Sequence, residues 1–182
     1  MTATSAALNG DSKTDLLKDF EQVQMGAAVS KLVAGAIGDI VMVMSKSAEH
    51  KGRALADIEW LILPAVFSGQ YYVAEVAQPD TSFRAPVACV TWAHVSDDVS
   101  ARLSGTQAGD LRPAPSEWMS GDHLWLIDLI GDRSALAAAL QVLGETHFKE
   151  KDVFIRIRQP DGTTGVETLA ALASAAGKGL AQ

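Results

Sequence analysis

The sequence has little of several features that would narrow its function. Cys89 is the single cysteine among 182 residues, which excludes an intramolecular disulfide and favours a reducing, cytoplasmic location. Basic residues number 15 against 22 acidic ones, for a net charge of −7. A general nucleic-acid binder usually has a positive net charge, so we expect no nucleic-acid partner.

Long apolar runs and a secretory signal are also missing. The first residues lack a basic stretch followed by an apolar core, so we expect no signal peptide. The run from Ile40 to Met44 is too short to cross a bilayer, which takes about 20 residues, and we expect no integral membrane segment. The spacing of His94, His123 and His147 does not match that of metal ligands, so we expect no metal.

The order of the expected elements indicates an α/β fold. Small polar residues predict a disordered tail over 1–12, helical spacing predicts a helical extension over 13–35, and we assign 36–182 to the main domain. Gly35 and Gly38 are the points where the long first helix could break. We expect further helices over 54–67, from 97, and over 134–143 and 166–176, and strands over 71–76, 87–94, 124–130 and 153–158. This order predicts an α/β sandwich with a mixed or antiparallel central sheet flanked by helices.

One acidic residue lies in an unusually apolar segment. Asp128 stands inside the strand Leu124 to Ile130, where its carboxylate loses water and stays ionised only beside a charged or donating group. His50 is a natural candidate, because a buried carboxylate next to a histidine makes a base that works near neutral pH. Strand alternation places Leu126, Asp128 and Ile130 on one face.

Each of these residues also has a structural interpretation. His50 can be a helix-end residue that caps carbonyl groups. Asp128 can form an internal salt bridge, for instance to Arg156 or Arg158. Ser47, three residues before His50, can serve as an N-cap or form a turn hydrogen bond. The residues alone leave these interpretations open.

Several short segments share a known order and spacing between roughly Ala36 and Asp132. The segments are Ile37-Gly38-Asp39-Ile40, Ser47-Ala48-Glu49-His50, Ile62-Leu63-Pro64-Ala65, Gly69-Gln70-Tyr71, Pro86-Val87-Ala88, Trp92-Ala93, Trp118-Met119-Ser120-Gly121-Asp122 and Leu124-Trp125-Leu126-Ile127-Asp128. This ordered set resembles the RTX toxin-activating lysine acyltransferases, the hemolysin-activating enzymes of RTX toxin operons.

The resemblance implies a fold similar to the GNAT acyltransferases and an acyltransferase domain over 36–182. The family's catalytic histidine and aspartate match His50 and Asp128, and Ser47 falls where the family has a serine. His50 is then the general base, and Asp128 orients it and stabilises its imidazolium. The implied reaction moves a fatty acyl group from acyl carrier protein to internal lysines of an RTX protoxin and so activates it, with the carrier thioester as co-substrate and no bound cofactor. A homodimer is also implied.

The turn after Asp128 is a candidate donor site. Gly131, Arg133 and Ser134 lead into a helix whose free N–H groups favour a phosphate such as that of phosphopantetheine. The alternative is a plain turn with Ser134 as N-cap. Family members commonly continue with an Ala-Pro-Phe-Gly-like loop, and the loop is shorter here.

A small basic cluster stands out in this acidic chain. Lys149, Lys151, Arg156 and Arg158 form a candidate docking patch for the acidic carrier protein. The alternative is solvated charge on an edge strand.

Two further interpretations concern covalent chemistry and the function as a whole. Cys89 could carry an acyl thioester, although its mid-strand position favours a buried structural thiol. The chain could also be a non-catalytic binding or chaperone-like relative, or an acyltransferase for a different protein or peptide acceptor.

Overall fold

The computed structural model describes residues 10–79, 81–105, 111–159 and 163–173. The chain divides by its internal contacts into two units, Met1–Gly35 and Ala36–Gln182. Helix α1 covers Gly10–Lys46 and therefore belongs to both. Residues 1–9 of the predicted tail lie outside the described residues, whereas residues 10–12 are helical.

Helix α1 corrects the expectation of a break at Gly35 or Gly38 and contains an apolar stretch that was not expected from the sequence. It is continuous through Gly35 and Gly38, because an isolated glycine weakens a helix without ending it. Its 25-residue stretch Gln22–Lys46 contains an 18-residue window with a mean hydropathy of 1.8, so the stretch is long and apolar enough to cross a membrane. Counting uninterrupted apolar residues missed this stretch, because Lys31 and Asp39 divide it. Core helices and N-terminal signal sequences share the property, so it is weak support for a membrane span.

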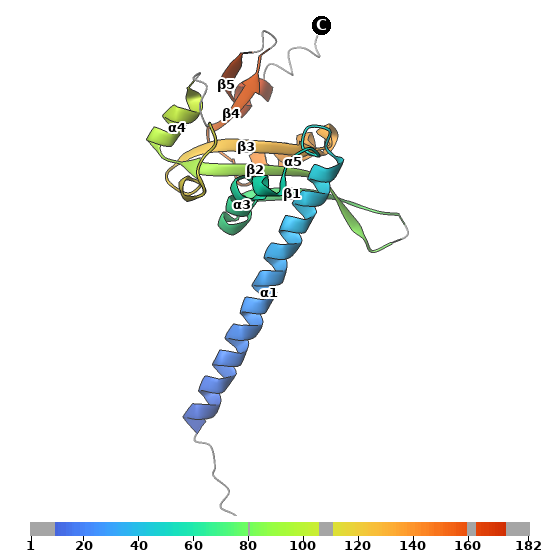
Figure 1. Ribbon diagram of the computed structural model, residues 1–182, viewed down its shortest axis with the longest axis vertical. Helices are drawn as coiled ribbons and strands as arrows, with labels where there is room; N and C mark the ends of the chain where they lie inside the picture. Colours follow the sequence, from blue (N-terminus) through green and yellow to red (C-terminus); the bar gives the residue numbers. More distant parts are fainter. Residues whose placement is uncertain (1–9, 80, 106–110, 160–162, 174–182) are drawn as a thin grey trace, which may run out of the picture. The chain divides into compact units, whose positions relative to one another are not determined.

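A mixed five-stranded sheet forms the centre of the second unit in the part of the chain that the structure describes (Figure 1). Three neighbouring pairs are antiparallel, and β3 and β4 are parallel. This arrangement confirms the predicted α/β, GNAT-like fold with a mixed sheet. In spatial order, the strands are β1 (Tyr71–Ala77), β2 (Arg84–Val95), β3 (His123–Gly131), β4 (Val153–Arg158) and β5 (Thr164–Thr168).

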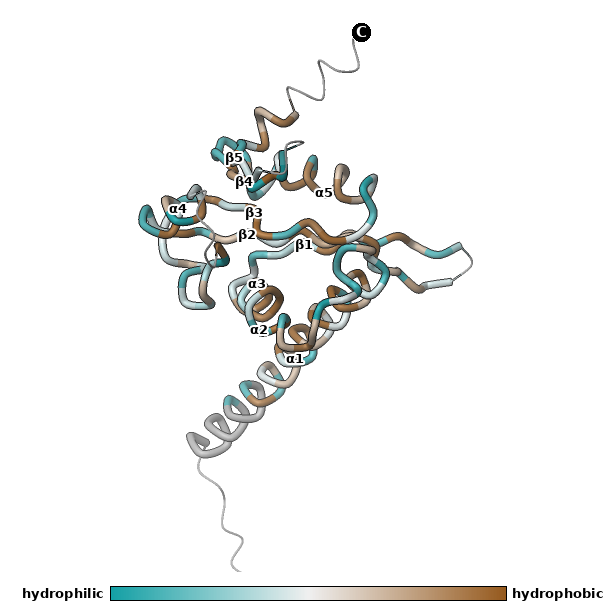
Figure 2. Tube along the Cα trace, turned by 45° about the horizontal axis from the view of Figure 1, so that its top comes forward, coloured by the Kyte–Doolittle hydropathy of each residue, from teal (hydrophilic) through white to brown (hydrophobic). Residues whose placement is uncertain are grey.

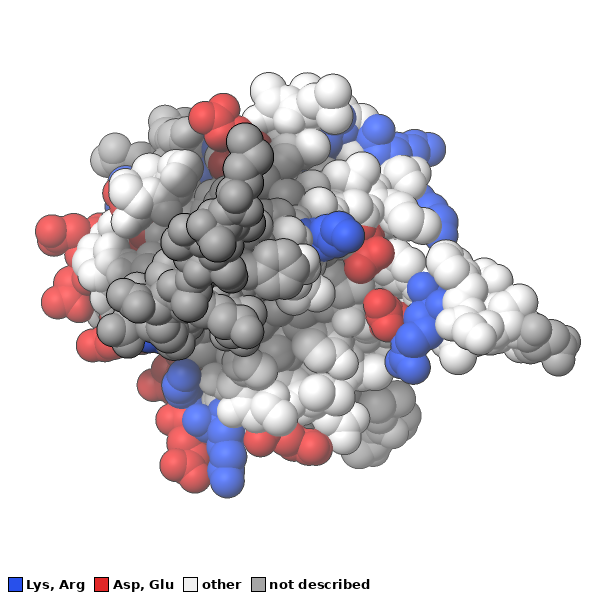
Figure 3. Space-filling view, turned by 90° about the horizontal axis from the view of Figure 1, so that it is seen from below, with Lys and Arg blue, Asp and Glu red and all other residues white. Residues whose placement is uncertain are grey.

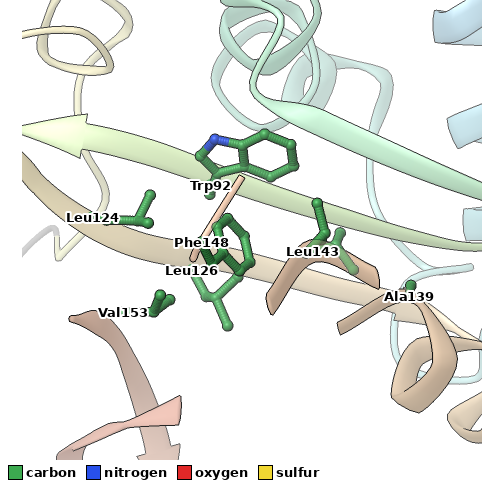
Figure 4. Packing of buried hydrophobic residues seen from close by; sticks show 8 residues of the cluster. Trp92, Leu124, Leu126, Ala139, Leu143, Phe148 and Val153 are labelled. Carbon is green, nitrogen blue, oxygen red and sulfur yellow. The ribbon is translucent and has the colours of Figure 1, made fainter. Parts of the chain in front are cut away.

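Helices cover both faces of this sheet (Figure 2). Helix α5 (Arg133–Glu145) lies on one face, where Trp92 and Phe148 meet edge to face with 5.3 Å between their ring centres (Figure 4). Helix α3 (Leu63–Ser68) lies on the other face. The α5-side core contains Val90, Trp92, Leu124, Leu126, Ala139, Leu143, Phe148 and Val153, and the α3-side core contains Ala65, Ala93, Val95, Val99, Leu103, Trp118 and Trp125.

A β-bulge in β3 decides where Asp128 points. Thr91 pairs with Asp128 but Trp92 pairs with Leu126, so Ile127 is an extra residue in β3. Leu129 consequently packs with Leu126 on the α5 side, and Asp128 shares the α3 side with its partner Thr91. The expectation that Leu126, Asp128 and Ile130 share one face is therefore wrong, because simple alternation does not hold across a bulge.

Two predicted helices have different boundaries. The segment 54–67 is divided into a short 3-10 turn (Leu55–Asp57), α2 (Ile58–Leu61) and α3, since Pro64 has no N–H and crowds the preceding turn. The segment 166–176 begins as β5, whose alternating Thr and Val residues pair with β4, and turns helical over 169–173. Its last residues lie outside the described ranges.

The parallel strands β3 and β4 pair over a short length. Their register joins Leu124–Leu126 with Val153–Ile155 and goes no further, although β3 continues to Gly131. The segment between β2 and β3 contains α4 (Asp97–Ser104), with Ser96 as its N-cap, and a 3-10 turn at Pro115–Glu117. Beyond the short pairing, the second half of β3 and its Asp128 carboxylate border a cavity.

Candidate active site

The end of α1 positions His50. Ala36, Ile40, Val43 and Met44 are buried at helical spacing and hold this part of the helix in the core. The helix ends at Lys46, and the following turn is closed by the Ser47 carbonyl, which accepts hydrogen bonds from the N–H groups of His50 and Lys51. This turn leaves His50 only 5% exposed.

His50 and Asp128 are in contact. The Nε2 atom of His50 lies 3.1 Å from both carboxylate oxygens of Asp128. Asp128 also accepts a hydrogen bond from the backbone N–H of Leu129, 2.8 Å away. The partner of Asp128 is thus the histidine and not Arg156 or Arg158, and the histidine ring binds a carboxylate instead of capping a helix.

Ser47 completes a row of three groups. Its Oγ lies 2.9 Å from Nδ1 of His50. Because a carboxylate only accepts hydrogen bonds, Nε2 carries the proton toward Asp128, and the Nδ1 lone pair accepts the Ser47 hydroxyl. The basic nitrogen of His50 is therefore Nδ1, on the side of Ser47.

The hydrogen bond to Asp128 raises the pKa of His50 above its usual value of 6.5. Burial acts in the opposite direction, as does the charge of Arg53, whereas the charge of Glu49 acts with Asp128. The carboxylate outweighs burial, so the imidazolium is stabilised relative to a histidine in water. A base of this kind takes a proton readily from an amine or hydroxyl.

Two cavities flank this row of side chains. The Asp128 cavity has a volume of about 610 Å³, and the Ser47 cavity has a volume of about 510 Å³. Glu49 and Leu129 line both. The Asp128 cavity is lined by Glu49, Arg53, Trp60, Leu103, Leu111, Arg112, Pro113, Trp125, Leu126, Ile127, Asp128, Leu129, Ile155 and Arg156, and the Ser47 cavity includes Val43, Lys46, Pro86, Val87, Gly131, Asp132, Arg133 and Leu136.

The comparison with protein families decides the assignment. Residues 30–168 match the model of the RTX toxin acyltransferase family, which is well over half of the 182 residues. The chain belongs to that family. The match begins slightly before the segments from which the resemblance was inferred and ends at β5. No curated protein matches the chain significantly.

Membership establishes the general activity. A chain of the RTX toxin acyltransferase family is an acyltransferase whose implied substrate is an RTX protoxin. The family match covers His50, Asp128 and Ser47. The roles of these three residues in catalysis remain predictions. The contacts of His50 with Asp128 and Ser47 are those that a supported general base requires.

The predicted donor turn has a different construction in this acyltransferase. The N-cap of α5 is Asp132, whose carboxylate accepts hydrogen bonds from the N–H groups of Ser134 and Ala135 at 2.9 and 3.0 Å and from the Ser134 hydroxyl. These bonds lower the pKa of Asp132, the Ser134 side chain first. Ser134 is therefore not the N-cap, and the helix end already binds an anion of its own chain.

Gly131 has a packing role at the same turn. Its φ is +109°, and an added Cβ would lie 2.3 Å from the Val87 carbonyl oxygen and 2.8 Å from Val43 Cγ1. Arg133 lines the Ser47 cavity together with Gly131. Glycine is required here because the backbone of β2 approaches closely.

The four basic residues of the predicted docking patch have two kinds of environment. Lys149, Lys151 and Arg158 are exposed. Arg156 lines the Asp128 cavity and donates to the backbone carbonyls of Leu103 and Gly105. Strand β4 is internal to the sheet, with β5 beside it, so the edge-strand interpretation is wrong. On the face shown in Figure 3, acidic side chains gather along the left edge and basic ones at the upper right, and both signs occur elsewhere among the coloured residues.

Cys89 is a buried thiol. Burial raises the pKa of Cys89 to about 12, so its nucleophilic thiolate form is scarce near neutral pH. This chemistry favours the structural interpretation of Cys89. Among the described residues, no group of three or more histidine, cysteine or acidic side chains has a metal-binding arrangement.

Sequence reasoning missed a cluster at the mouth of the Asp128 cavity. The guanidinium groups of Arg53 and Arg112 lie over the Trp60 ring, 5.5 and 4.3 Å from its centre. The Trp60 N–H donates to Asp57 at 2.9 Å, which fixes the ring. Arg112 is far from Trp60 in sequence, so no local pattern could have indicated the contact.

Proposed function

We propose that this acyltransferase moves a fatty acyl group from acyl carrier protein to the ε-amine of internal lysines in an RTX protoxin. The contact between His50 and Asp128 is the observation that carries the proposal, since it supplies a buried, carboxylate-supported base. The neighbouring cavity also has an apolar wall that suits a fatty chain, formed by Leu103, Leu111, Leu126, Ile127, Leu129 and Ile155.

The proton acceptor in this mechanism is Nδ1 of His50. Ser47 already donates its hydroxyl proton toward that nitrogen. As the lysine nitrogen attacks the thioester carbonyl, Ser47 takes the amine proton and passes its own to Nδ1. Asp128 keeps the ring in the tautomer with the proton on Nε2 and stabilises the imidazolium that forms.

The second half of the reaction returns the proton. The tetrahedral intermediate collapses, the carbon–sulfur bond breaks, and the pantetheine thiolate leaves. The proton held at His50 moves to that thiolate, which gives the free carrier thiol and a neutral histidine. The net change is one amide bond formed and one thioester bond broken, without any other reactant.

Charge supports the choice of carrier protein as donor. Lys149, Lys151 and Arg158 are exposed cations on a chain of net charge −7, and a carrier protein is acidic. We retain these three as the carrier-docking residues. The cytoplasmic location, inferred from the single cysteine, and the homodimer, implied by the family resemblance, remain predictions.

The test combines purified protein, acyl-loaded carrier protein and a candidate protoxin. Lysine peptides of the protoxin are then examined by mass spectrometry for the mass of the acyl group. We expect adducts with the wild-type protein and none above background with His50→Ala. Absence of any adduct with the wild-type protein, or full activity of His50→Ala, rejects the mechanism.

The same experiment separates the alternatives. Stable binding of carrier or protoxin without turnover would identify a non-catalytic relative, which has no need of a buried base. Acylation of a different protein or peptide would keep the chemistry and change the acceptor.

A further inference from the structure

The Arg53–Trp60–Arg112 cluster is the strongest feature that the proposed reaction leaves unexplained. Arg53 and Trp60 precede β1 in the sequence and Arg112 follows β2. Both guanidinium groups nevertheless lie over the same indole ring. Cation–π contact orients a guanidinium without neutralising its charge. The hydrogen bond from Trp60 and the nearby charges of Arg53 and Arg112 lower the pKa of Asp57, so one carboxylate accompanies the two guanidinium groups and the cluster keeps a net positive charge.

The charge of the Asp128 cavity differs from that of the whole chain. Its lining has three arginines, Arg53, Arg112 and Arg156, against the two carboxylates of Glu49 and Asp128. The chain as a whole has an excess of acidic residues. A cationic cavity in an acidic protein favours an anionic ligand.

The same cavity has a second chemical character. Beside the arginines, it is walled by apolar side chains and reaches the Asp128 carboxylate of the candidate base. A ligand that fits must carry an anionic group at one end and an apolar portion further along. An acyl group on a phosphopantetheine arm has this distribution.

The N-terminus of α5 is the competing phosphate site. Its Ser134 and Ala135 N–H groups are bound to the Asp132 carboxylate. A phosphate there would meet that negative charge and displace those bonds. The arginine cluster, by contrast, offers guanidinium donors, the group best suited to bind phosphate oxygens in pairs.

We propose that Arg53 and Arg112, stacked on Trp60, bind the phosphate of the donor's phosphopantetheine arm at the mouth of the Asp128 cavity. The inference rests on the proposed function, because it names the donor-binding site of that reaction. Trp60 serves as the platform that holds both guanidinium groups. Asp57 fixes the platform through the indole N–H.

Binding of two small probes tests the proposal without any acyl transfer. Pantetheine 4′-phosphate and pantetheine differ only in the phosphate, and titration calorimetry measures the affinity of the full-length protein for each. We expect wild-type protein to prefer the phosphorylated probe by about 10-fold or more, the size of one charge-assisted hydrogen-bonded contact. The double variant Arg53→Gln/Arg112→Gln should bind both probes alike.

Three further variants make the result specific. Arg84→Gln removes the same charge at an exposed ion pair with Glu75 and should keep the wild-type preference. Arg53→Lys/Arg112→Lys keeps the charges at the same positions, so it should keep part of the preference and controls for folding. Arg133→Gln tests the end of α5 and should change nothing.

Two results overturn the inference. One is equal binding of both probes by the wild-type protein. The other is a preference that survives in Arg53→Gln/Arg112→Gln but disappears in Arg133→Gln, which would place the phosphate at α5. Failure of acyl transfer with a persisting, arginine-dependent phosphate preference would reject the proposed function and leave the binding site in place.

Discussion

Two histidines of this protein stand in similar surroundings but have different partners. His50 follows helix α1 and His94 belongs to strand β2, and each has a ring nitrogen within hydrogen-bond distance of the side-chain oxygen of Asp128 or Gln70. For His50 the oxygen belongs to the Asp128 carboxylate, 3.1 Å away. For His94 it belongs to the Gln70 amide, 2.7 Å from Nδ1.

The partners shift the two pKa values in opposite directions. The hydrogen bond to Asp128 raises the pKa of His50. Burial lowers the pKa of His94, helped by the charge of Lys151 and opposed by Asp122, because a neutral amide does little to stabilise an imidazolium. Burial alone therefore does not make a strong base, and the carboxylate is the part that distinguishes the candidate active site.

Removal of the two histidines is the most direct way to test this difference. His50→Ala should lower the rate of acyl transfer by about 10²–10⁴-fold, the usual contribution of a general base. His94→Ala should stay within a few-fold of wild type, since Gln70 Oε1 still accepts the backbone N–H of residue 94. Rates are measured from lysine acylation of the protoxin at saturating carrier. Equal losses in both variants would contradict the assignment.

Asp128→Asn would give His50 a neutral amide as its partner, as His94 has in Gln70. The variant should lose about 10²-fold or more in rate, because an amide neither stabilises the imidazolium nor fixes the tautomer. The pKa of His50 should fall, so the acid limb of the pH–rate profile should move to lower pH. Arg53 and Glu49 remain in place in this variant, so the change isolates Asp128. An unchanged acid limb would mean that His50 is not the titrating base.

Ser47→Ala tests the third member of the row. The variant loses the hydrogen bond to Nδ1 and the proton relay through Ser47, so the rate should fall by at least about 10-fold, the value of one hydrogen bond to a group that becomes charged. Ser45→Ala is the matched control, because the Ser45 hydroxyl bonds only to the nearby Met42 carbonyl among the bonds described. A larger loss than in His50→Ala would instead indicate that Ser47 carries the acyl group.

The smallest expected effect concerns stability. A raised pKa means that the folded state binds the His50 proton more tightly than the unfolded state, so the contact with Asp128 stabilises fully below pH 6.5 and less as pH rises through the raised pKa. The lowered pKa of His94 has the opposite sign, and its folded state loses stability as pH falls below 6.5.

Urea unfolding of wild type, Asp128→Asn and His94→Gln across this pH range measures both contributions. The stability difference between wild type and Asp128→Asn should shrink with rising pH. His94→Gln should gain relative to wild type as pH falls. Parallel pH profiles for all three proteins would show that neither histidine is linked to folding in this way.

Much of the site could be predicted from local chemistry. An aspartate inside an apolar strand needs a charged or donating partner, which left His50, Arg156 and Arg158 as candidates, and the family resemblance favoured His50. Strands β1 to β4 were also predictable, because β-branched and aromatic residues mark them clearly, whereas β5 lies in a segment expected to be helical.

The bulge at Ile127 and the approach of Arg112 to Trp60 were not predictable, since each depends on which residue folding places opposite another. The Asp132 cap is a local contact, but only Ser134 was expected at that position.

The extra residue at Ile127 determines which side of the sheet the acid faces. If the same residues paired without a bulge, strict alternation would turn the acid toward the apolar layer beneath α5 and away from its imidazole. A variant that lacks Ile127 would pair regularly with β2 and keep the acid on its present side, so its turnover should suffer less than that of a variant lacking a paired residue of the same strand.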